Sequence, residues 1–213
     1  MNVTSGPKTT GGVMLGITGG IAAGKSQVAE YLCRHGNFTG IDVDLLGRQL
    51  LESGQKGYLA IKDRFGSCFF RDDRSLDRVR LRRAIFTDSA LRIEINRLLH
   101  PLIREAMHLR ATAAFRAGAE IVLVEVPLLY EAGWQQDFKL VIVVQVANKL
   151  ALKRLQQRDG VSEDEALAAL TARMTSDERV SRADLIIDNS GDWQTTCRQL
   201  DLLIPRLKEM CKG

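Results

Sequence analysis

The feature that most constrains the fold is a glycine-rich segment near the amino end of the chain. Residues 13–18 read Val-Met-Leu-Gly-Ile-Thr, a strand-like run, and residues 19–26 match the pattern G-x-x-x-x-G-K-[ST]. Glycine lacks the Cβ atom that would hold the backbone away from an anion, so successive N–H groups can curl around phosphate oxygens. The pattern therefore predicts a strand, a phosphate-binding loop and a helix, in that order.

Two side chains at the end of this loop suit a nucleoside triphosphate. Lys25 would supply a mobile positive charge, and the Ser26 hydroxyl would offer an oxygen ligand to Mg²⁺ shared with the β- and γ-phosphates. A helix with a buried apolar face is expected next, ending at Gly36 as a left-handed cap. That face comprises Val28, Ala29, Leu32 and Cys33. The simpler alternative is a glycine turn joining a strand to a helix, but the flanking strand and amphipathic helix favour phosphate binding.

Composition is typical of a soluble enzyme. The chain has 213 residues, of which 45% are hydrophobic, enough for a substantial core in one domain with insertions. Its longest apolar stretch, residues 121–129, is broken by Glu125 and Pro127 and is too short to span a bilayer. Residues 1–12 lack the apolar core of a secretion signal and are expected to form a loose polar tail. The four scattered cysteines lack C-x-x-C spacing, so neither a zinc site nor a disulfide framework is predicted. We expect a cytoplasmic protein.

Strand-like runs alternate with helical stretches along the chain, which predicts an α/β fold with a parallel sheet. Strands are expected at residues 13–18, 39–43, 120–126, 140–146 and 185–187. A mostly helical insert separates the second and third strands. After the fourth strand, two helices flank Arg158-Asp159-Gly160, and the second opens with a capping box from Ser162 to Glu165. The last helix should begin at Trp193 and be interrupted at Pro205.

Acidic residues stand at the ends of two predicted strands. Asp42 and Asp44 end the second strand, which lies beside the first in many such folds, and ligands gather beyond the carboxyl ends of parallel strands. If that strand continues, its alternation sends both carboxylates to one side. One could act as a base toward an acceptor hydroxyl, and the other could hold a metal-bound water; the alternative is a solvated turn. Glu125, at the end of the third strand, could assist Mg²⁺ through water.

Ten arginines lie between residues 71 and 110. Such a segment could receive phosphates. The simpler interpretation is that most of them pair with nearby carboxylates on a solvated helix surface, so that only a few can be ligands.

Several stretches together resemble one enzyme family from Met14 to Gly191. They are the loop at residues 16–26, I-D-V-D at 41–44 with Arg48, L-D-R at 76–78 with L-R at 81–82, H-P-L-I-R at 100–104, P-L-L-Y-E at 127–131, R-D at 158–159 and A-D-L-I-I-D-N-S-G at 183–191. Their combination, order and spacing are similar to those of the dephospho-coenzyme A kinases. The resemblance implies transfer of the ATP γ-phosphoryl group to the ribose 3′-hydroxyl of dephospho-coenzyme A, the last step of coenzyme A synthesis, with Mg²⁺.

The resemblance also implies a three-layer P-loop kinase fold with a five-stranded parallel sheet. The nucleotide-binding core would comprise residues 13–44, 119–149 and 181–213. The helical coenzyme A-binding insert would be residues 45–118, and the helical lid would be residues 150–180.

Site residues carry over by position from the family. Asp44 matches the catalytic base, and Lys25 and Arg158 would bear charge in the transition state. The ATP site would comprise Gly20, Ile21, Ala22, Ala23, Gly24, Lys25, Ser26 and Gln27, the lid arginines Arg154 and Arg158, and Asn189 and Gly191 near adenine. The acceptor site would comprise Asp44, Arg48, Arg78, Arg82, His100, Arg104 and Glu131. His100 could instead cap a helix before Pro101, and Glu131 could instead bind a neighbouring helix. Mg²⁺ would be held by Ser26, with Asp42 or Glu125 acting through water.

Several departures from the family pattern are visible, including Ala169 and Arg173 at lid positions where Arg and Gln are frequent. Ala22 stands where glycine is more frequent, which is tolerable only if its φ is negative, and Glu125 replaces the usual aspartate.

Two other functions fit parts of the sequence. One is a nucleoside or nucleotide kinase with another acceptor. The other is a nucleotide-dependent switch or RNA-binding protein, which the absence of N-K-x-D and of an aromatic RNA motif disfavours. We therefore expect neither a nucleic-acid nor a membrane partner, and a monomer, although the sequence leaves the oligomeric state open.

Overall fold

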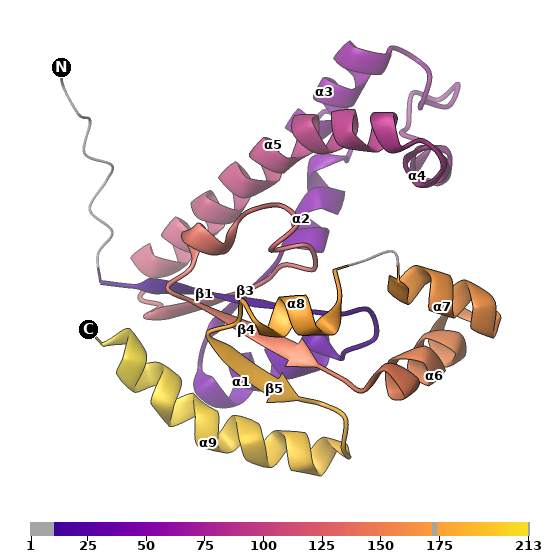
Figure 1. The fold of residues 1–213 in the computed structure, drawn as a ribbon. Helices are drawn as coiled ribbons and strands as arrows, with labels where there is room; N and C mark the ends of the chain where they lie inside the picture. Colours follow the sequence, from indigo (N-terminus) through magenta and orange to yellow (C-terminus); the bar gives the residue numbers. More distant parts are fainter. Residues whose placement is uncertain (1–10, 172–173, 213) are drawn as a thin grey trace. The chain divides into compact units, whose positions relative to one another are not determined.

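The computed structural model describes residues 11–171 and 174–212, which divide into two compact units (Figure 1). The first unit comprises the residues up to 41 together with those from 111 onward, and the second comprises residues 42–110. Most of the expected amino-terminal tail, residues 1–10, lies outside the described residues. The boundaries expected for the core, the insert and the lid stay predictions.

A five-stranded sheet organises the first unit, and the predicted α/β fold is confirmed. Its order is β2 (Thr39–Asp42), β3 (Ile121–Glu125), β1 (Val13–Gly19), β4 (Leu140–Gln145) and β5 (Leu185–Asp188). β1 pairs in parallel with β3 and with β4, and β4 pairs in parallel with β5. The expectation that the second strand lies beside the first is wrong, because β3 takes that place.

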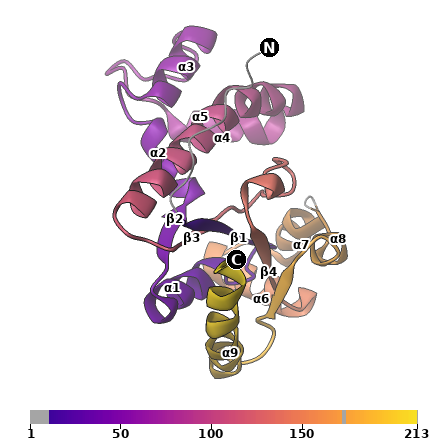
Figure 2. The same ribbon diagram turned by 90° about the vertical axis from the view of Figure 1, so that its left-hand side faces the viewer.

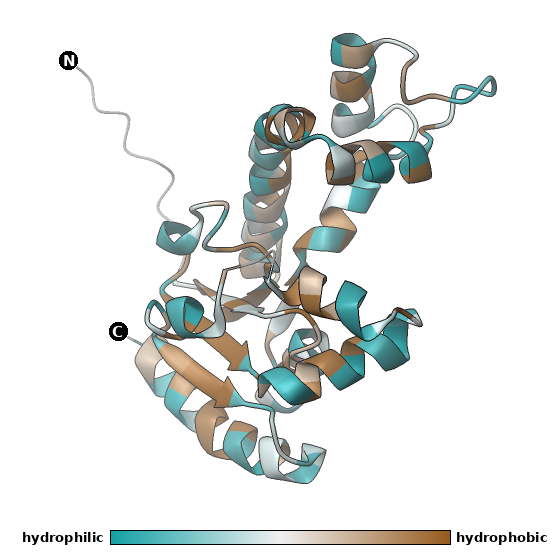
Figure 3. Ribbon diagram, turned by 45° about the vertical axis from the view of Figure 1, so that its right-hand side comes forward, coloured by the Kyte–Doolittle hydropathy of each residue, from teal (hydrophilic) through white to brown (hydrophobic). Residues whose placement is uncertain are grey.

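The core of the first unit lies between the sheet and its covering helices. Leu15 and Ile17 of β1 and Ile142 of β4 are fully buried, and the strands are brown along much of their length in Figure 3. Helices α1 (Lys25–Gly36) and α9 (Trp193–Cys211) lie side by side (Figure 2) and contribute Leu32 and Leu200 to the same cluster. A strand buried on both faces needs a continuous apolar run, which β1 and β4 supply.

Helix α1 ends one residue later than predicted. Gly36 is helical and buried, and the left-handed cap is Asn37, with a φ of 58°. The N–H groups of Asn37 and Phe38 both reach the carbonyl of Cys33. Asparagine tolerates this conformation, and a side chain at position 36 would meet the Phe38 ring at 2.9 Å. The predicted cap at Gly36 is therefore wrong, and the glycine is required for packing.

The second strand stops at Asp42, and helix α2 (Val43–Leu50) begins immediately. Asp42 is the N-cap: its carboxylate accepts a hydrogen bond from the N–H of Leu45 at 3.0 Å. The strand does not continue, so the expected alternation of Asp42 and Asp44 on one side of a strand is wrong. Asp44 lies instead in the first turn of α2.

The second unit is helical. After α2 it contains α3 (Lys56–Phe65), α4 (Arg78–Thr87) and most of α5 (Ser89–Arg116), whose last residues belong to the first unit. Its own apolar cluster includes Ile61, Leu81 and Ile95. Helix α5 continues through Pro101, so His100 is an interior helical residue and the alternative of a helix-capping histidine is wrong.

Three further helices follow β4 in the first unit. Helix α6 (Asn148–Asp159) ends at Gly160, whose φ is 66°, and α7 (Glu163–Thr171) begins with the predicted capping box. Ser162 donates its N–H to the Glu165 carboxylate at 2.9 Å and accepts the N–H of Glu165 at 3.3 Å. Helix α8 (Ser176–Val180) follows, and a short 3₁₀ turn, η1 (Gln135–Asp137), precedes β4.

The last helix is not interrupted, contrary to expectation. Helix α9 runs from Trp193 to Cys211 through Pro205. Pro205 is exposed, while Leu200, Ile204 and Leu207 are buried on the other side of the helix. Their burial offsets the lost backbone hydrogen bond. Within residues 11–171 and 174–212, no helix is both long and apolar enough to span a membrane.

Candidate active site

The phosphate loop lies where β1 ends and α1 begins, at the carboxyl edge of the sheet. The Lys25 ammonium donates to the carbonyl oxygens of Gly19 at 3.2 Å and Gly20 at 3.0 Å. The N–H of Ala23 points back to the Gly20 carbonyl at 3.4 Å. The loop thus curls around the end of its own lysine, which places a positive charge inside the turn.

Ala22 adopts a left-handed backbone conformation, with a φ of 58°. The expectation that this residue needs a negative φ is wrong for this chain. A left-handed alanine costs about 1 kcal/mol because its Cβ crowds the following carbonyl. The loop therefore holds that strain at Ala22.

Gly24 and Asn189 fit against each other. Gly24 has a φ of 84°, and a Cβ atom there would lie 2.4 Å from the Asn189 side-chain nitrogen. That nitrogen donates to the Ala23 carbonyl at 2.8 Å, and the Asn189 side-chain oxygen accepts from the Thr196 hydroxyl at 2.9 Å. Asn189 is 2% exposed. It therefore supports the loop from the β5 side, and its contact with adenine stays a prediction.

A hydroxyl and a carboxylate meet at the end of the loop. Ser26, in the first turn of α1, donates from Oγ to Oε1 of Glu125, at the end of β3, at a distance of 2.7 Å. Hard oxygen donors of this kind suit Mg²⁺, which is held by one or two protein oxygens together with water and substrate phosphates. In the described part of the chain no three His, Cys, Asp or Glu side chains gather into a ready-made metal site. The donor set fits a magnesium ion that arrives with the nucleotide.

The two arginines predicted for the lid have different partners, although both lie on α6. Arg154 donates from Nη2 to the backbone carbonyl of Asn189 at 3.2 Å. Arg158 pairs with Asp159 through two bonds of 2.7 and 2.8 Å. This pair raises the pKa of Arg158 and lowers that of Asp159. Arg154 therefore contacts Asn189, the residue that supports the loop, whereas Arg158 is paired with Asp159.

A cavity of about 400 Å³ opens beside the phosphate loop. Gly20, Ile21 and Ala23 line it together with the end of β4, the first turns of α6, the last turns of α7 and Arg179 of α8. The loop is therefore exposed to a cavity and is not closed off by its own chain.

Glu131 has the helix partner that one interpretation of the sequence foresaw. Its carboxylate Oε1 lies 3.8 Å from Arg179 Nη2. Sequence reasoning missed Arg179, because a single arginine in a polar stretch carries no motif and its burial becomes visible only in the fold. The pairing with Arg179 does not test the predicted role of Glu131 as an acceptor contact.

Gln27 and Gly191 complete the predicted nucleotide residues. Gln27 is exposed in the first turn of α1. Gly191 lies just before α9, where an added Cβ would be in ordinary contact with Thr195 at 3.7 Å.

The predicted acceptor residues lie in the second unit, apart from Glu131. Arg78 begins α4 and donates from Nη2 to the backbone carbonyl of Arg48 in α2 at 2.9 Å, so these two are brought together. Arg82 is exposed one turn further along α4. His100 and Arg104 follow each other by one turn of α5, and burial lowers the pKa of His100, which favours its neutral form.

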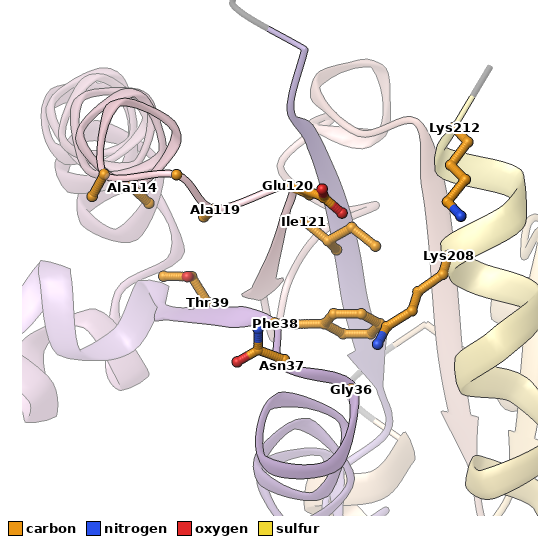
Figure 4. Close-up of a pocket in the computed structure, with 12 residues that line it drawn as sticks. Gly36, Asn37, Phe38, Thr39, Ala114, Ala119, Glu120, Ile121, Lys208 and Lys212 are labelled. Carbon is orange, nitrogen blue, oxygen red and sulfur yellow. The ribbon is translucent and has the colours of Figure 1, made fainter.

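A second cavity, of about 600 Å³, lies at the other edge of the sheet, where β2 and β3 begin (Figure 4). Its lining residues include Phe38, Ile121, Lys208 of α9 and Lys212, the residue that follows α9. Ligands of open parallel sheets bind beyond the carboxyl ends of the strands, so the cavity at the phosphate loop is the stronger candidate site.

Comparison with known proteins points to one enzyme family. A family model described as dephospho-CoA kinase matches residues 13–195. The dephospho-CoA kinase of Bacillus licheniformis is 37% identical over 192 residues, which cover 90% of this chain and 95% of that relative. The dephospho-CoA kinase of Syntrophotalea carbinolica is 37% identical over 201 residues, covering 94% and 95%.

Two solved structures share the fold. TT1252 from Thermus thermophilus superposes with a TM-score of 0.78 and 29% identity, covering 93% of this chain and 99% of that one. A dephospho-CoA kinase from Campylobacter jejuni gives a TM-score of 0.68 at 24% identity, covering 92% and 97%.

Proposed function

The chain belongs to the dephospho-CoA kinase family, and we infer that it transfers the γ-phosphoryl group of ATP to the ribose 3′-hydroxyl of dephospho-coenzyme A. The observation that carries this function is the phosphate loop with Lys25 curled inside it and the Ser26–Glu125 contact at its end, in a chain that matches the family over residues 13–195. A kinase with another acceptor and an RNA-binding switch are both less favoured by the family match.

We propose that the nucleotide half of the site works mainly by positioning and charge. The loop N–H groups and Lys25 would hold the triphosphate, and Arg154 and Arg158 would approach it from the lid. Ser26 would hold Mg²⁺, with Asp42 or Glu125 acting through water, and the bound ion would supply positive charge beside the triphosphate. Asn189 keeps the loop in shape through the Ala23 carbonyl.

For the acceptor half, we propose that Asp44 orients the 3′-hydroxyl and accepts its proton. Arg48, Arg78, Arg82 and Arg104 would bind the acceptor phosphates, with His100 and Glu131 as further contacts. The neutral form of His100 that burial favours allows it to donate one hydrogen bond and accept another. A monomer in the cytoplasm stays the expectation.

A single-turnover assay tests this function. Purified protein is incubated with ATP, Mg²⁺ and dephospho-coenzyme A, and mass spectrometry follows the acceptor. A gain of about 80 Da, one phosphoryl group, at the 3′-oxygen is expected. Adenosine, nucleoside monophosphates and shikimate in parallel reactions identify any other acceptor. Faster phosphorylation of one of these would assign the chain a different substrate within the same reaction class, and RNA binding without any turnover would reject the kinase.

A further inference from the structure

The proposed function assigns no role to a buried arginine on the short helix α8. Arg179 is 4% exposed, and removing a guanidinium from water costs several kcal/mol unless other groups compensate. The helix that carries it is firmly capped. Thr175 and Glu178 form a reciprocal capping box. The Glu178 N–H donates to the Thr175 hydroxyl oxygen at 3.2 Å, and the Thr175 N–H donates to the Glu178 carboxylate at 3.0 Å. The backbone therefore presents Arg179 in a fixed place.

The guanidinium touches three segments that are distant in sequence. It donates from Nη2 to the backbone carbonyl of Met174 at 2.8 Å, and the same nitrogen lies 3.8 Å from Glu131 Oε1. Its Nη1 lies 3.6 Å from where a Cβ atom would stand on Gly20. Arg179 thus reaches the lid connection, the segment after β3 and the phosphate loop.

Gly20 is consequently flanked by two cations. The Lys25 ammonium is 3.0 Å from its carbonyl oxygen, and the Arg179 guanidinium lies beside its Cα. Glu131 Oε1 lies 3.8 Å from Arg179 Nη2, longer than a close charge-assisted hydrogen bond. Both Arg179 and Gly20 line the 400 Å³ cavity. Positive charge at the wall of a cavity favours a polyanion as its occupant.

A purely structural role for Arg179 explains less. The segment that carries Glu131 is already fixed to the end of α8 by its neighbour: Tyr130 donates its hydroxyl to the Arg182 carbonyl at 2.8 Å, and the Arg182 guanidinium lies 5.9 Å from the centre of the Tyr130 ring. Together with the capping box, these contacts anchor α8 without any buried charge. Arg179, by contrast, reaches the phosphate loop at Gly20 and lines the cavity beside it.

We propose that Arg179 is a further residue of the triphosphate site, in which it supplies fixed positive charge at the Gly20 end of the loop while Glu131 orients its guanidinium. This inference rests on the proposed binding of ATP phosphates at the loop, and it holds whichever acceptor the enzyme uses. Arg154 and Arg158 approach from α6, so Arg179 adds charge from a third helix.

Nucleotide binding without acceptor tests the proposal. Dissociation constants for ATP and AMP are measured by titration calorimetry for wild type, R179Q, R179K and R182Q. R179Q should bind ATP at least about tenfold more weakly, the loss of one charge-assisted contact, and AMP less than about twofold more weakly. R179K should recover part of the ATP affinity, because lysine keeps the positive charge but lacks the planar set of donors of the guanidinium. R182Q, the matched control three residues on, should resemble wild type.

The ratio of the two affinities separates charge from architecture. A structural defect would weaken the binding of ATP and AMP alike, whereas the loss of a contact with the triphosphate would weaken the binding of ATP. Equal losses for both nucleotides, or an ATP affinity in R179Q within twofold of wild type, would overturn the proposal. Should R179Q fail to fold, R179Q/E131Q removes both charges of the pair; a folded double variant with wild-type ATP affinity also refutes it. Since no acceptor is present, a failure to phosphorylate dephospho-coenzyme A leaves this result interpretable.

Discussion

At the residue scale, Gly24 is a position where the loop tolerates no side chain. An added Cβ would overlap the Asn189 amide, which is itself fixed by Ala23 and Thr196. G24A should therefore displace Asn189 and lower ATP affinity by about tenfold or more, since a buried amide would lose one or both partners. Calorimetric titration with ATP measures the effect.

Gly160 provides the matched control for this substitution. It also has a positive φ, 66°, but no atom lies within 4 Å of its added Cβ. G160A carries the conformational penalty of alanine, about 1 kcal/mol, without the clash. An ATP affinity in G24A as high as that in G160A would show that the contact with Asn189 does not govern the requirement for glycine at position 24.

Asp44 is the residue on which the chemical step should depend most. D44N keeps the shape of the side chain but cannot accept the hydroxyl proton, so kcat should fall by roughly 100-fold or more. ATP affinity should change little, because Asp44 is assigned to the acceptor. Steady-state kinetics on dephospho-coenzyme A provide the measurement. D63N, an exposed aspartate of α3, is the control, and a kcat for D44N close to that of D63N would remove Asp44 from the role of base.

At the scale of elements, local sequence patterns predicted individual strands, helices and caps, but they did not predict which strands pair in the sheet. The strand, loop and first helix follow from spacing and glycine placement within residues 13–36, and the α7 capping box follows from Ser162 and Glu165 alone. The place of β2 beside β3 depends on which strands pair across the sheet, and no local signal specifies it.

Competition between local preferences explains the remaining errors. Asp42 could end a strand or cap a helix, and the N-cap bond to Leu45 decided for the helix. A proline such as Pro205 is expected to break a helix, but the burial of Leu200 and Leu207 stabilises α9 on both sides of it. The burial of Arg179 needs the fold itself, because its neighbours at positions 20, 131 and 174 are brought together only in three dimensions.

Helix α5 should respond to pH through His100. Burial lowers the pKa of His100 below the ordinary 6.5, so the unfolded chain binds a proton more readily than the folded one. The free energy of unfolding should therefore decrease as the pH falls below about 6.5 and be unaffected by this group above it. Because His100 is only half-buried, its share between pH 7.5 and 5.5 should stay below about 1 kcal/mol. Urea unfolding of wild type and H100Q at both pH values measures it.

The expected signature is a smaller pH dependence in H100Q than in wild type. H108Q removes an exposed histidine two turns further along the same helix and controls for the loss of an imidazole. An H100Q variant that loses as much stability as wild type on acidification would assign the effect to other groups.

At the scale of the whole molecule, the two units have separate apolar cores. Ile61 is fully buried in the cluster of the second unit, and Leu200 is fully buried in that of the first. I61A and L200A should each lower the free energy of unfolding by about 2–5 kcal/mol through lost burial and a new cavity. Urea unfolding quantifies both changes, and the double variant should show nearly additive losses because the clusters share no member.

Ligand binding should then distinguish the two variants, because each core supports a different half of the proposed site. Leu200 packs with the elements that carry the phosphate loop, so L200A should weaken ATP binding by calorimetry. Ile61 packs with α4 and α5, which carry Arg78, Arg82 and His100, so I61A should raise KM for dephospho-coenzyme A while the ATP dissociation constant stays within about twofold of wild type. If I61A weakened ATP as much as L200A, the second unit could not be an acceptor module that is stabilised by its own core.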